Sequence, residues 1–271
     1  ERVPDSFSGG LAVCGPIGSF RKQIDYFEDF RVLFDYFYPR VLPPSPLEVP
    51  PNLMAGWETT YAPQVLDALA AHPRVAAQLI STSKAAIDPA NPATIGDTTL
   101  GVLWYSVFAT NDAIFKLGGN PFDNKTRWYW GSANDRRLNM RVQRFTADPE
   151  ALSALQAYET SGLLSRPLVT MHTTRDPVVP FWHEILYTMK ASLRNPGKVI
   201  PIPISAYGHC SFTQEQLMAG FGLLVWAATG QQPAGLTLQF EPEQVQQDWA
   251  GAQQEWEGAQ LEFAAPEELV K

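Results

Sequence analysis

The segment from Pro167 to Gly230 limits the possible folds more than any other part of this chain. Two apolar runs with the residue types of β-strands alternate there with two amphipathic runs of helical periodicity, and the connections are short. In chain order these runs span 168–172, 182–193, 198–204 and 213–229. Strand, helix, strand, helix with short loops is typical of parallel α/β architecture. The sequence therefore predicts an α/β fold in which helices cover both faces of a parallel sheet.

A third strand and a helical insertion are predicted before this segment. Residues 10–14 are a short apolar run between glycines and Pro16, as expected of a buried strand. Residues 20–165, by contrast, show helical periodicity punctuated by proline, and we expect a mainly helical insertion there. Within it, Asp148 followed by Pro149 predicts the start of a helix that runs to about Thr160, with the aspartate as its N-cap.

Composition and charge exclude several classes of protein. Hydrophobic residues make up 45% and charged residues 18% of the 271, which is enough for one sizeable globular core. The longest apolar run, 219–228, falls short of the roughly 18 residues that a membrane span needs. Residues 236–271 carry eight acids and one lysine, so they account for most of the net charge of -8. We expect no membrane span, no nucleic-acid partner and an acidic tail, 233–271, of one or two surface helices.

Two polar residues follow the predicted strands at the positions where α/β proteins carry their functional groups. Asp176 comes after the strand at 168–172, and His209 comes after the strand at 198–204. The carboxyl ends of parallel strands lie at one edge of a sheet, where ligands bind in open α/β folds. A carboxylate can orient an imidazole, and the imidazole can then accept a proton from a nucleophile. Asp176 and His209 are therefore candidate catalytic residues, and no metal ligand set or cofactor site is expected.

The chain at this point resembles the last third of the α/β-hydrolase fold. The resemblance rests on Asp176 in an Asp-Pro-x-Val-Pro loop, a helix, a strand, His209 in a Gly-His loop and a further helix, in the family's order. It covers about residues 1–19 and 166–232, which would form part of the hydrolase core. Residues 20–165 would then be the cap or lid that many members carry, and a minority of its aromatic side chains would line an acyl pocket.

The resemblance implies a nucleophile that this sequence lacks. Members of the family carry serine in G-x-S-x-G before the strand that we assign to 10–14, and no serine here fits that motif, Ser8 and Ser132 being the nearest approximations. The chain begins with Glu1 rather than methionine and leads almost directly into a buried strand. We therefore expect an amino-terminal half that carries the serine, either upstream in the same polypeptide or on a second chain.

The remaining histidines and the two cysteines receive simpler interpretations. His72, His172 and His183 are expected to be packing or surface residues. Cys14 is expected to be a small buried hydrophobic residue, with a disulfide to Cys210 as the alternative. Cysteine beside a catalytic histidine also resembles an arrangement in tannase and feruloyl esterase enzymes, where the partner cysteine neighbours the nucleophile. The compartment in which the protein works cannot be read from two cysteines.

These features together predict a serine hydrolase that acts on an ester or amide through an acyl-enzyme. His209 would act first as base and then as acid, and Asp176 would orient it. Two alternatives stay open. One is an aminopeptidase-like serine peptidase of the same fold, and the other is a noncatalytic scaffold or binding protein that has lost the nucleophile.

Overall fold

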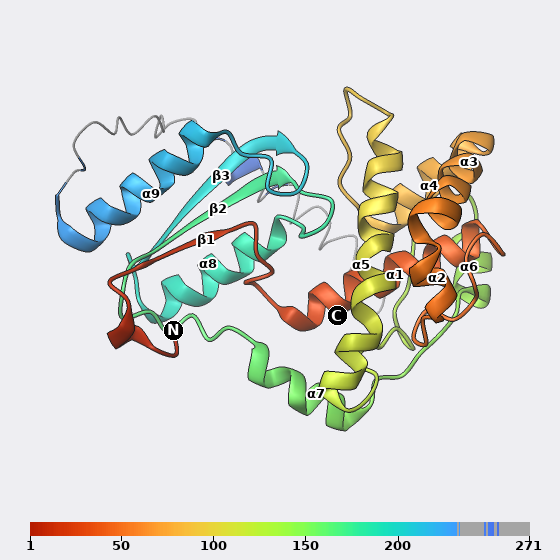
Figure 1. Ribbon diagram of the computed structural model, residues 1–271, viewed down its shortest axis with the longest axis horizontal. Helices are drawn as coiled ribbons and strands as arrows, with labels where there is room; N and C mark the ends of the chain where they lie inside the picture. Colours follow the sequence, from red (N-terminus) through yellow and green to blue (C-terminus); the bar gives the residue numbers. More distant parts are fainter. Residues whose placement is uncertain (232, 234–246, 248, 252–253, 255–271) are drawn as a thin grey trace, which may run out of the picture. The chain divides into compact units, whose positions relative to one another are not determined.

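The computed structural model describes residues 1–231, 233, 247, 249–251 and 254 (Figure 1). Its internal contacts divide the chain into two compact units. The first, which we call the sheet unit, consists of Glu1–Ser19 and Glu159–Lys271. The second, the helical unit, is Phe20–Tyr158. Each unit is described by itself below.

The sheet unit contains a three-stranded parallel sheet, as the sequence predicts. Its strands are β1 (Gly10–Val13), β2 (Leu168–Arg175) and β3 (Val199–Tyr207), in the order β1-β2-β3. Gly10 pairs with Leu168, and Leu168 pairs with Val199, so the three strands begin level with one another. β2 and β3 each extend three residues further than the sequence indicates, to Arg175 and Tyr207, which are themselves register partners.

Helices α8 (Trp182–Arg194) and α9 (Gln214–Thr229) cover opposite faces of this sheet (Figure 1). Side chains alternate between the two faces along a strand. Val169 and Met171 pack in the cluster that contains Leu224 of α9, whereas Thr170 bonds to Glu184 of α8. The start of α9 has a capping box formed by Thr213 and Gln216, which satisfies two backbone N–H groups that helix geometry leaves without partners.

The helical unit contains helices and loops and no strand. Its elements are α1 (Phe20–Phe37), α2 (Pro51–Ala55), the π-helical turn η2 (Trp57–Tyr61), α3 (Ala62–Ala71), α4 (Pro73–Ser83), α5 (Thr94–Leu117), α6 (Asp135–Arg141), α7 (Pro149–Leu155) and the short 3-10 helix η3 (Gln156–Tyr158). Phe30, Leu33 and Phe34 of α1 are fully buried, and α1 packs against α4 and α5. Apolar side chains of α1 therefore contribute to the core of this unit. The sheet unit also contains the 3-10 turn η1 (Pro4–Ser6) near its amino terminus.

The sequence-based account of Asp148 is wrong in two respects. Its side chain does not cap α7, because its carboxylate accepts instead from the backbone N–H of Asn120, at 2.7 Å, and so ties two loops together. The helix is also shorter than predicted, since it ends at Leu155 and tightens into η3. Residues 159–165, which we assigned to the insertion, group with the sheet unit, where Thr160 donates to the carbonyl of Ile17.

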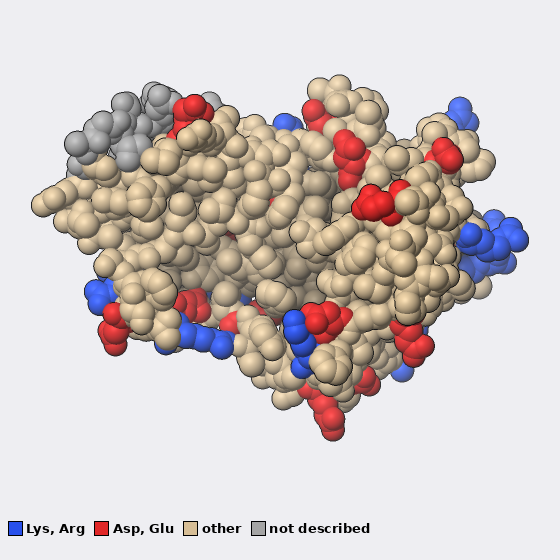
Figure 2. Space-filling view, viewed as in Figure 1, with Lys and Arg blue, Asp and Glu red and all other residues tan. Residues whose placement is uncertain are grey.

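Within the described residues no helix is both long enough and apolar enough to cross a bilayer. Lysine and arginine side chains lie in separate small groups on the face drawn in Figure 2. The predicted acidic tail, 233–271, falls largely outside the described residues. Trp249, which is described, lies with its ring centre 5.9 Å from that of Phe181.

Candidate functional site

The carboxyl ends of β2 and β3 bring Asp176 and His209 together. Because Arg175 and Tyr207 are register partners, the residues that follow them leave the sheet at the same level. The turn after β3 is fastened to β2 by two bonds: Gly208 N–H donates to the Arg175 carbonyl, and Thr173 Oγ1 donates to the Gly208 carbonyl. Gly208 has a φ of 111°, a conformation that favours glycine.

The two candidate residues are hydrogen-bonded, as we predicted. His209 Nδ1 lies 2.8 Å from Asp176 Oδ2. The Asp176 carboxylate is buried, and its other oxygen accepts from the backbone N–H groups of Val178 (2.8 Å) and Val179 (3.0 Å). The His209 side chain is 32% exposed, and within the described residues the one hydrogen-bond contact of its Nε2 is with the Cys210 sulfur, at 4.0 Å. The arrangement fixes one nitrogen of the ring and leaves the other accessible to a proton donor.

A second histidine, which the sequence led us to treat as a packing or surface residue, belongs to the same network. His172 is fully buried on β2, and its Nε2 lies 2.7 Å from the Val179 carbonyl and 3.4 Å from Asp176 Oδ2. Its Nδ1 lies 3.5 Å from Glu184 Oε1 on α8. The other oxygen of Glu184 accepts from Thr170 Oγ1 at 2.6 Å. The period-2 alternation of β2 points Thr170 and His172 to the α8 face, and that alternation was the signal available in the sequence.

This network has one imidazole between two buried carboxylates, and its electrostatics follow from that. Burial disfavours a charged His172, but its interactions with Asp176 and then Glu184 outweigh burial and raise the pKa of His172 to about 9. Burial likewise opposes the ionisation of Asp176, yet the bonds from His172 and His209 hold its pKa below the usual range. At neutral pH, Asp176 is therefore an anion held between an imidazolium and the His209 ring.

The charge of His172 leads to a prediction that does not depend on any activity. We expect both ring nitrogens of His172 to remain protonated at pH 7.5, because two carboxylates face the ring. Glu184→Gln removes one of these charges and should lower the pKa of His172, as measured by ¹⁵N NMR of the ring. Glu215→Gln, at a fully exposed glutamate on α9, is the matched control. A neutral His172 at pH 7.5 in the unaltered protein would contradict the expectation.

Raised pKa values of histidine also affect stability. His172 binds its proton more tightly in the folded state, so its contribution to stability is complete below pH 6.5 and is lost as the pH rises through about 9. The carboxylates of Asp176 and Glu184, which hold the proton on His172, thus make this part of the sheet unit less stable in alkaline solution.

The structure corrects our preferred interpretation of the cysteines. Cys14 and Cys210 form a disulfide, with their Cα atoms 5.5 Å apart, rather than leaving Cys14 as a free buried residue. Cys14 directly follows β1, and Cys210 follows His209, so the bond links the carboxyl end of β1 to the histidine loop. Both residues have positive φ, 45° and 53°. The sequence could not decide this, because 196 positions separate the pair.

Removing this disulfide should destabilise the sheet unit. A cross-link between distant residues restricts the unfolded chain, and native disulfides typically contribute about 2–4 kcal/mol. We expect the double variant Cys14→Ser/Cys210→Ser to lower the free energy of urea unfolding by that amount and to increase amide exchange in the loop that holds His209. The unaltered chain treated with thiol reductant is the matched comparison. An unchanged unfolding midpoint in both would rule the cross-link out as a stabilising element.

The same cysteines are relevant to metal binding. Cys14, His209 and Cys210 are the one group of three or more potential ligands that lies close enough together for a metal ion, in the part of the chain that the structure describes. The disulfide occupies both sulfurs, so neither can ligate as a thiolate. The oxidised chain therefore offers a metal only His209 at this place.

The other candidates from the sequence have structural roles. His183 is fully buried and its Nδ1 accepts from the backbone N–H groups of Gly18 and Ser19. The backbone of His72 precedes α4, and its carbonyl accepts from the Tyr38 hydroxyl. Ser132 donates from its hydroxyl to Asp135 in the turn before α6. None of these groups is bonded to Asp176 or His209 among the described contacts.

Comparison with known proteins identifies no relative: no family model, no curated protein and no solved structure matches this chain. The assignment of a function therefore rests on the geometry of the Asp176–His209 pair and its surroundings.

Proposed function

We propose that this chain supplies the acid and the base of a serine hydrolase of the α/β-hydrolase type, one that cleaves an ester or amide. The observation that carries the proposal is the 2.8 Å bond between Asp176 and His209 at the ends of adjacent parallel strands. Two features support it further: the acid is buried and anchored by backbone N–H groups, and the base keeps one nitrogen free of strong partners among the described residues.

In this mechanism each residue has one task. Asp176 accepts the Nδ1 proton of His209 in a hydrogen bond, so the lone pair of the neutral ring lies on Nε2. Nε2 takes the proton of a serine hydroxyl as the oxygen attacks the substrate carbonyl, and Asp176 stabilises the resulting imidazolium. His209 then returns that proton to the leaving alcohol or amine, which leaves an acyl-enzyme. Water, deprotonated by the same Nε2, hydrolyses the acyl-enzyme and regenerates the serine.

The serine in this proposal comes from polypeptide outside these 271 residues. β1 is an edge strand in the described sheet, with β2 on one side only. Its backbone can therefore accept a further parallel strand, and in the hydrolase fold the strand before the nucleophile lies on that side of the sheet. The helical unit then corresponds to a cap inserted between two strands of the core.

Labelling with a fluorophosphonate, which reacts with activated serines, tests the proposal. The natural polypeptide that carries these residues, at its native length, should be labelled at a serine outside residues 1–271, and His209→Ala should abolish the labelling. His72→Ala, which changes a histidine outside the site, is the matched control. Peptide and ester substrate panels then separate an aminopeptidase-like enzyme from an esterase. Absence of labelling in the native polypeptide would favour a noncatalytic scaffold, and labelling within residues 1–271 would refute the placement of the serine.

A further inference from the structure

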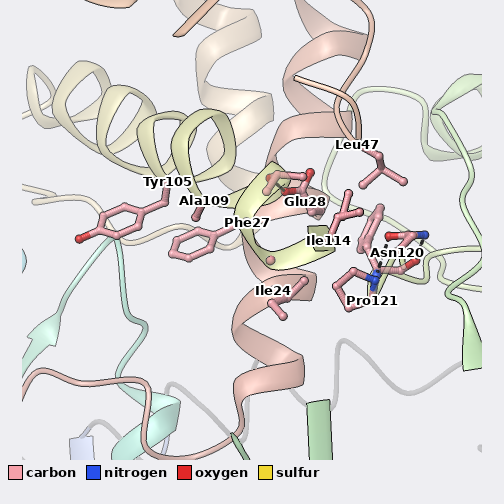
Figure 3. A pocket seen from close by; sticks show the side chains of 12 residues that line it. Ile24, Phe27, Glu28, Leu47, Tyr105, Ala109, Ile114, Asn120 and Pro121 are labelled. Carbon is pink, nitrogen blue, oxygen red and sulfur yellow. Dashed lines mark hydrogen bonds between the residues drawn. The ribbon is translucent and has the colours of Figure 1, made fainter. Parts of the chain in front are cut away.

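A small pocket in the helical unit lies between α1 and α5 (Figure 3). The centre of a water molecule can occupy about 40 Å³ of it, roughly three times what one water needs. Phe27 of α1 and Tyr105 of α5 stack at one wall, with ring centres 5.1 Å apart. Ile24, Leu47, Ile114 and Phe122 contribute further apolar surface, and the exposed Ala109 places part of the rim at the protein surface. The pocket is thus accessible and mainly apolar.

One acidic side chain contributes to this apolar lining. Glu28 is 3% exposed and comes from α1, one residue after Phe27. Its Oε1 is hydrogen-bonded to Thr110 Oγ1 of α5, and its Oε2 is buried without a hydrogen-bond partner among the described residues. A buried polar atom without a partner is destabilising, because it has lost its hydrogen bonds to water. Since the Glu28 side chain lines the pocket, a ligand bound there can supply the missing group.

The hydrogen bonds of Thr110 show what that group must be. Thr110 Oγ1 lies 2.6 Å from the Ser106 carbonyl as well as close to Glu28 Oε1, although a hydroxyl has one proton to donate. A carbonyl only accepts, so both bonds form together when Glu28 is protonated on Oε1 and donates to Thr110. Oε2 is then the carbonyl oxygen of a neutral acid. If Glu28 instead ionises, Oε2 is a carboxylate oxygen. Oε2 can therefore accept a hydrogen bond whether Glu28 is neutral or ionised.

The ligand must therefore donate a hydrogen bond and be otherwise apolar. Burial raises the pKa of Glu28 to about 8, although the Thr110 bond and the charge of Arg31 act in the opposite direction. The acid is consequently neutral at pH 7, and it gives a cationic amine no charge to compensate the loss of its hydration. A neutral hydroxyl group meets the requirement without that penalty.

We propose that this pocket is a binding site for a small aliphatic alcohol, whose hydroxyl donates to Glu28 Oε2 and whose hydrocarbon part lies against Phe27, Tyr105 and Ile114. The site is independent of the Asp176–His209 pair and does not require the proposed hydrolase activity. Its size suits a short chain rather than a lipid tail.

Binding of butan-1-ol to the 271-residue chain tests this site. We expect saturable ¹³C methyl shifts at Ile24 and Ile114, and an affinity at least tenfold lower for 1-chlorobutane, which matches butanol in size but has no hydroxyl. Glu28→Leu should remove that preference, whereas Glu58→Leu, at an exposed position, should retain it. Ala113→Leu narrows the pocket and keeps Glu28, so it should weaken the binding of both ligands. This variant tests the location of the site if Glu28→Leu does not fold.

Two results would overturn the proposal. Equal affinities for butan-1-ol and 1-chlorobutane in the unaltered chain would show that Glu28 does not recognise the hydroxyl. Absence of saturable shifts at both isoleucines throughout the titration would show that the pocket does not bind the alcohol. A tenfold difference in affinity corresponds to about 1.4 kcal/mol of binding free energy.

Discussion

Asp176→Asn is expected to lower the rate of fluorophosphonate labelling and of substrate turnover about 10⁴-fold in the native polypeptide. In the triad proteases the equivalent change leaves the geometry intact but selects the wrong histidine tautomer, with a loss of that size. Here an asparagine amide would donate to His209 Nδ1, which in the unaltered chain bonds to the Asp176 carboxylate. The proton of the ring would move to Nε2, and the nitrogen that must act as base would lose its lone pair.

The tautomer can be measured without any substrate. The ¹⁵N shifts of His209 in the 271-residue chain should indicate a protonated Nδ1 in the unaltered protein and a protonated Nε2 in Asp176→Asn. Asp5→Asn makes the same chemical change at an exposed position and should leave both the tautomer and the labelling rate unchanged. If Asp176→Asn altered the tautomer yet left labelling intact, His209 would not be the base. If neither changed, Asp176 would not be its partner.

Glu28→Gln is expected to stabilise the helical unit in alkaline solution by about 4 kcal/mol. The folded state raises the pKa of Glu28 from 4.5 to about 8, mainly because the side chain is buried. The proton is therefore bound more tightly in the folded state, and the stability that it contributes is complete below pH 4.5 and is lost as the pH rises to about 8. Each pKa unit corresponds to about 1.4 kcal/mol, so roughly three units between pH 5 and 8 give the expected difference.

Urea unfolding from pH 5 to 9 measures this effect, with amide exchange in α1 and α5 as a local readout. Asp29 and Asp35 of α1 also have raised pKa values, about 7 and about 6, and titrate in both proteins. The difference between Glu28→Gln and the unaltered chain therefore reports the ionisation of Glu28 together with its electrostatic interaction with Asp29 and Asp35. Glu58→Gln, at an exposed glutamate, should follow the unaltered chain. Parallel pH profiles for Glu28→Gln and the unaltered protein would mean that Glu28 is ionised in the folded state at neutral pH.

The sequence alone is enough to predict the arrangement of strands and helices in the sheet unit. Apolar runs of strand type, separated by amphipathic helices and short loops, allow few arrangements other than a parallel α/β sheet, because side-chain periodicity decides which faces are buried. The same pattern places Asp176 and His209 at neighbouring strand ends, and the structure confirms their hydrogen bond. The membership in the hydrolase fold and the location of a nucleophile stay proposals, since no relative matches the chain.

The helical unit was less predictable in its details. Its mainly helical character follows from periodicity and proline, but α2 and α6 were not predicted, because both are short and their stability depends on packing rather than on intrinsic propensity. Asp148 shows the same limit. Its sequence context is that of an N-cap, yet a backbone N–H 28 residues away competes successfully for its carboxylate.

The tertiary structure alone decided the features that depend on side chains distant in the chain. A histidine within a strand, such as His172, gives no local sign that two carboxylates will lie beside its ring. These belong to Asp176, in the loop after β2, and to Glu184 of α8. Cys14 and Cys210 become partners only because the end of β1 and the histidine loop both lie at the carboxyl ends of the parallel strands. Local periodicity determined the elements and the two strand-end residues. Three features depend instead on contacts between elements that are distant in the sequence, which local patterns do not predict. They are the charge state of His172, the disulfide and the pocket beside Glu28.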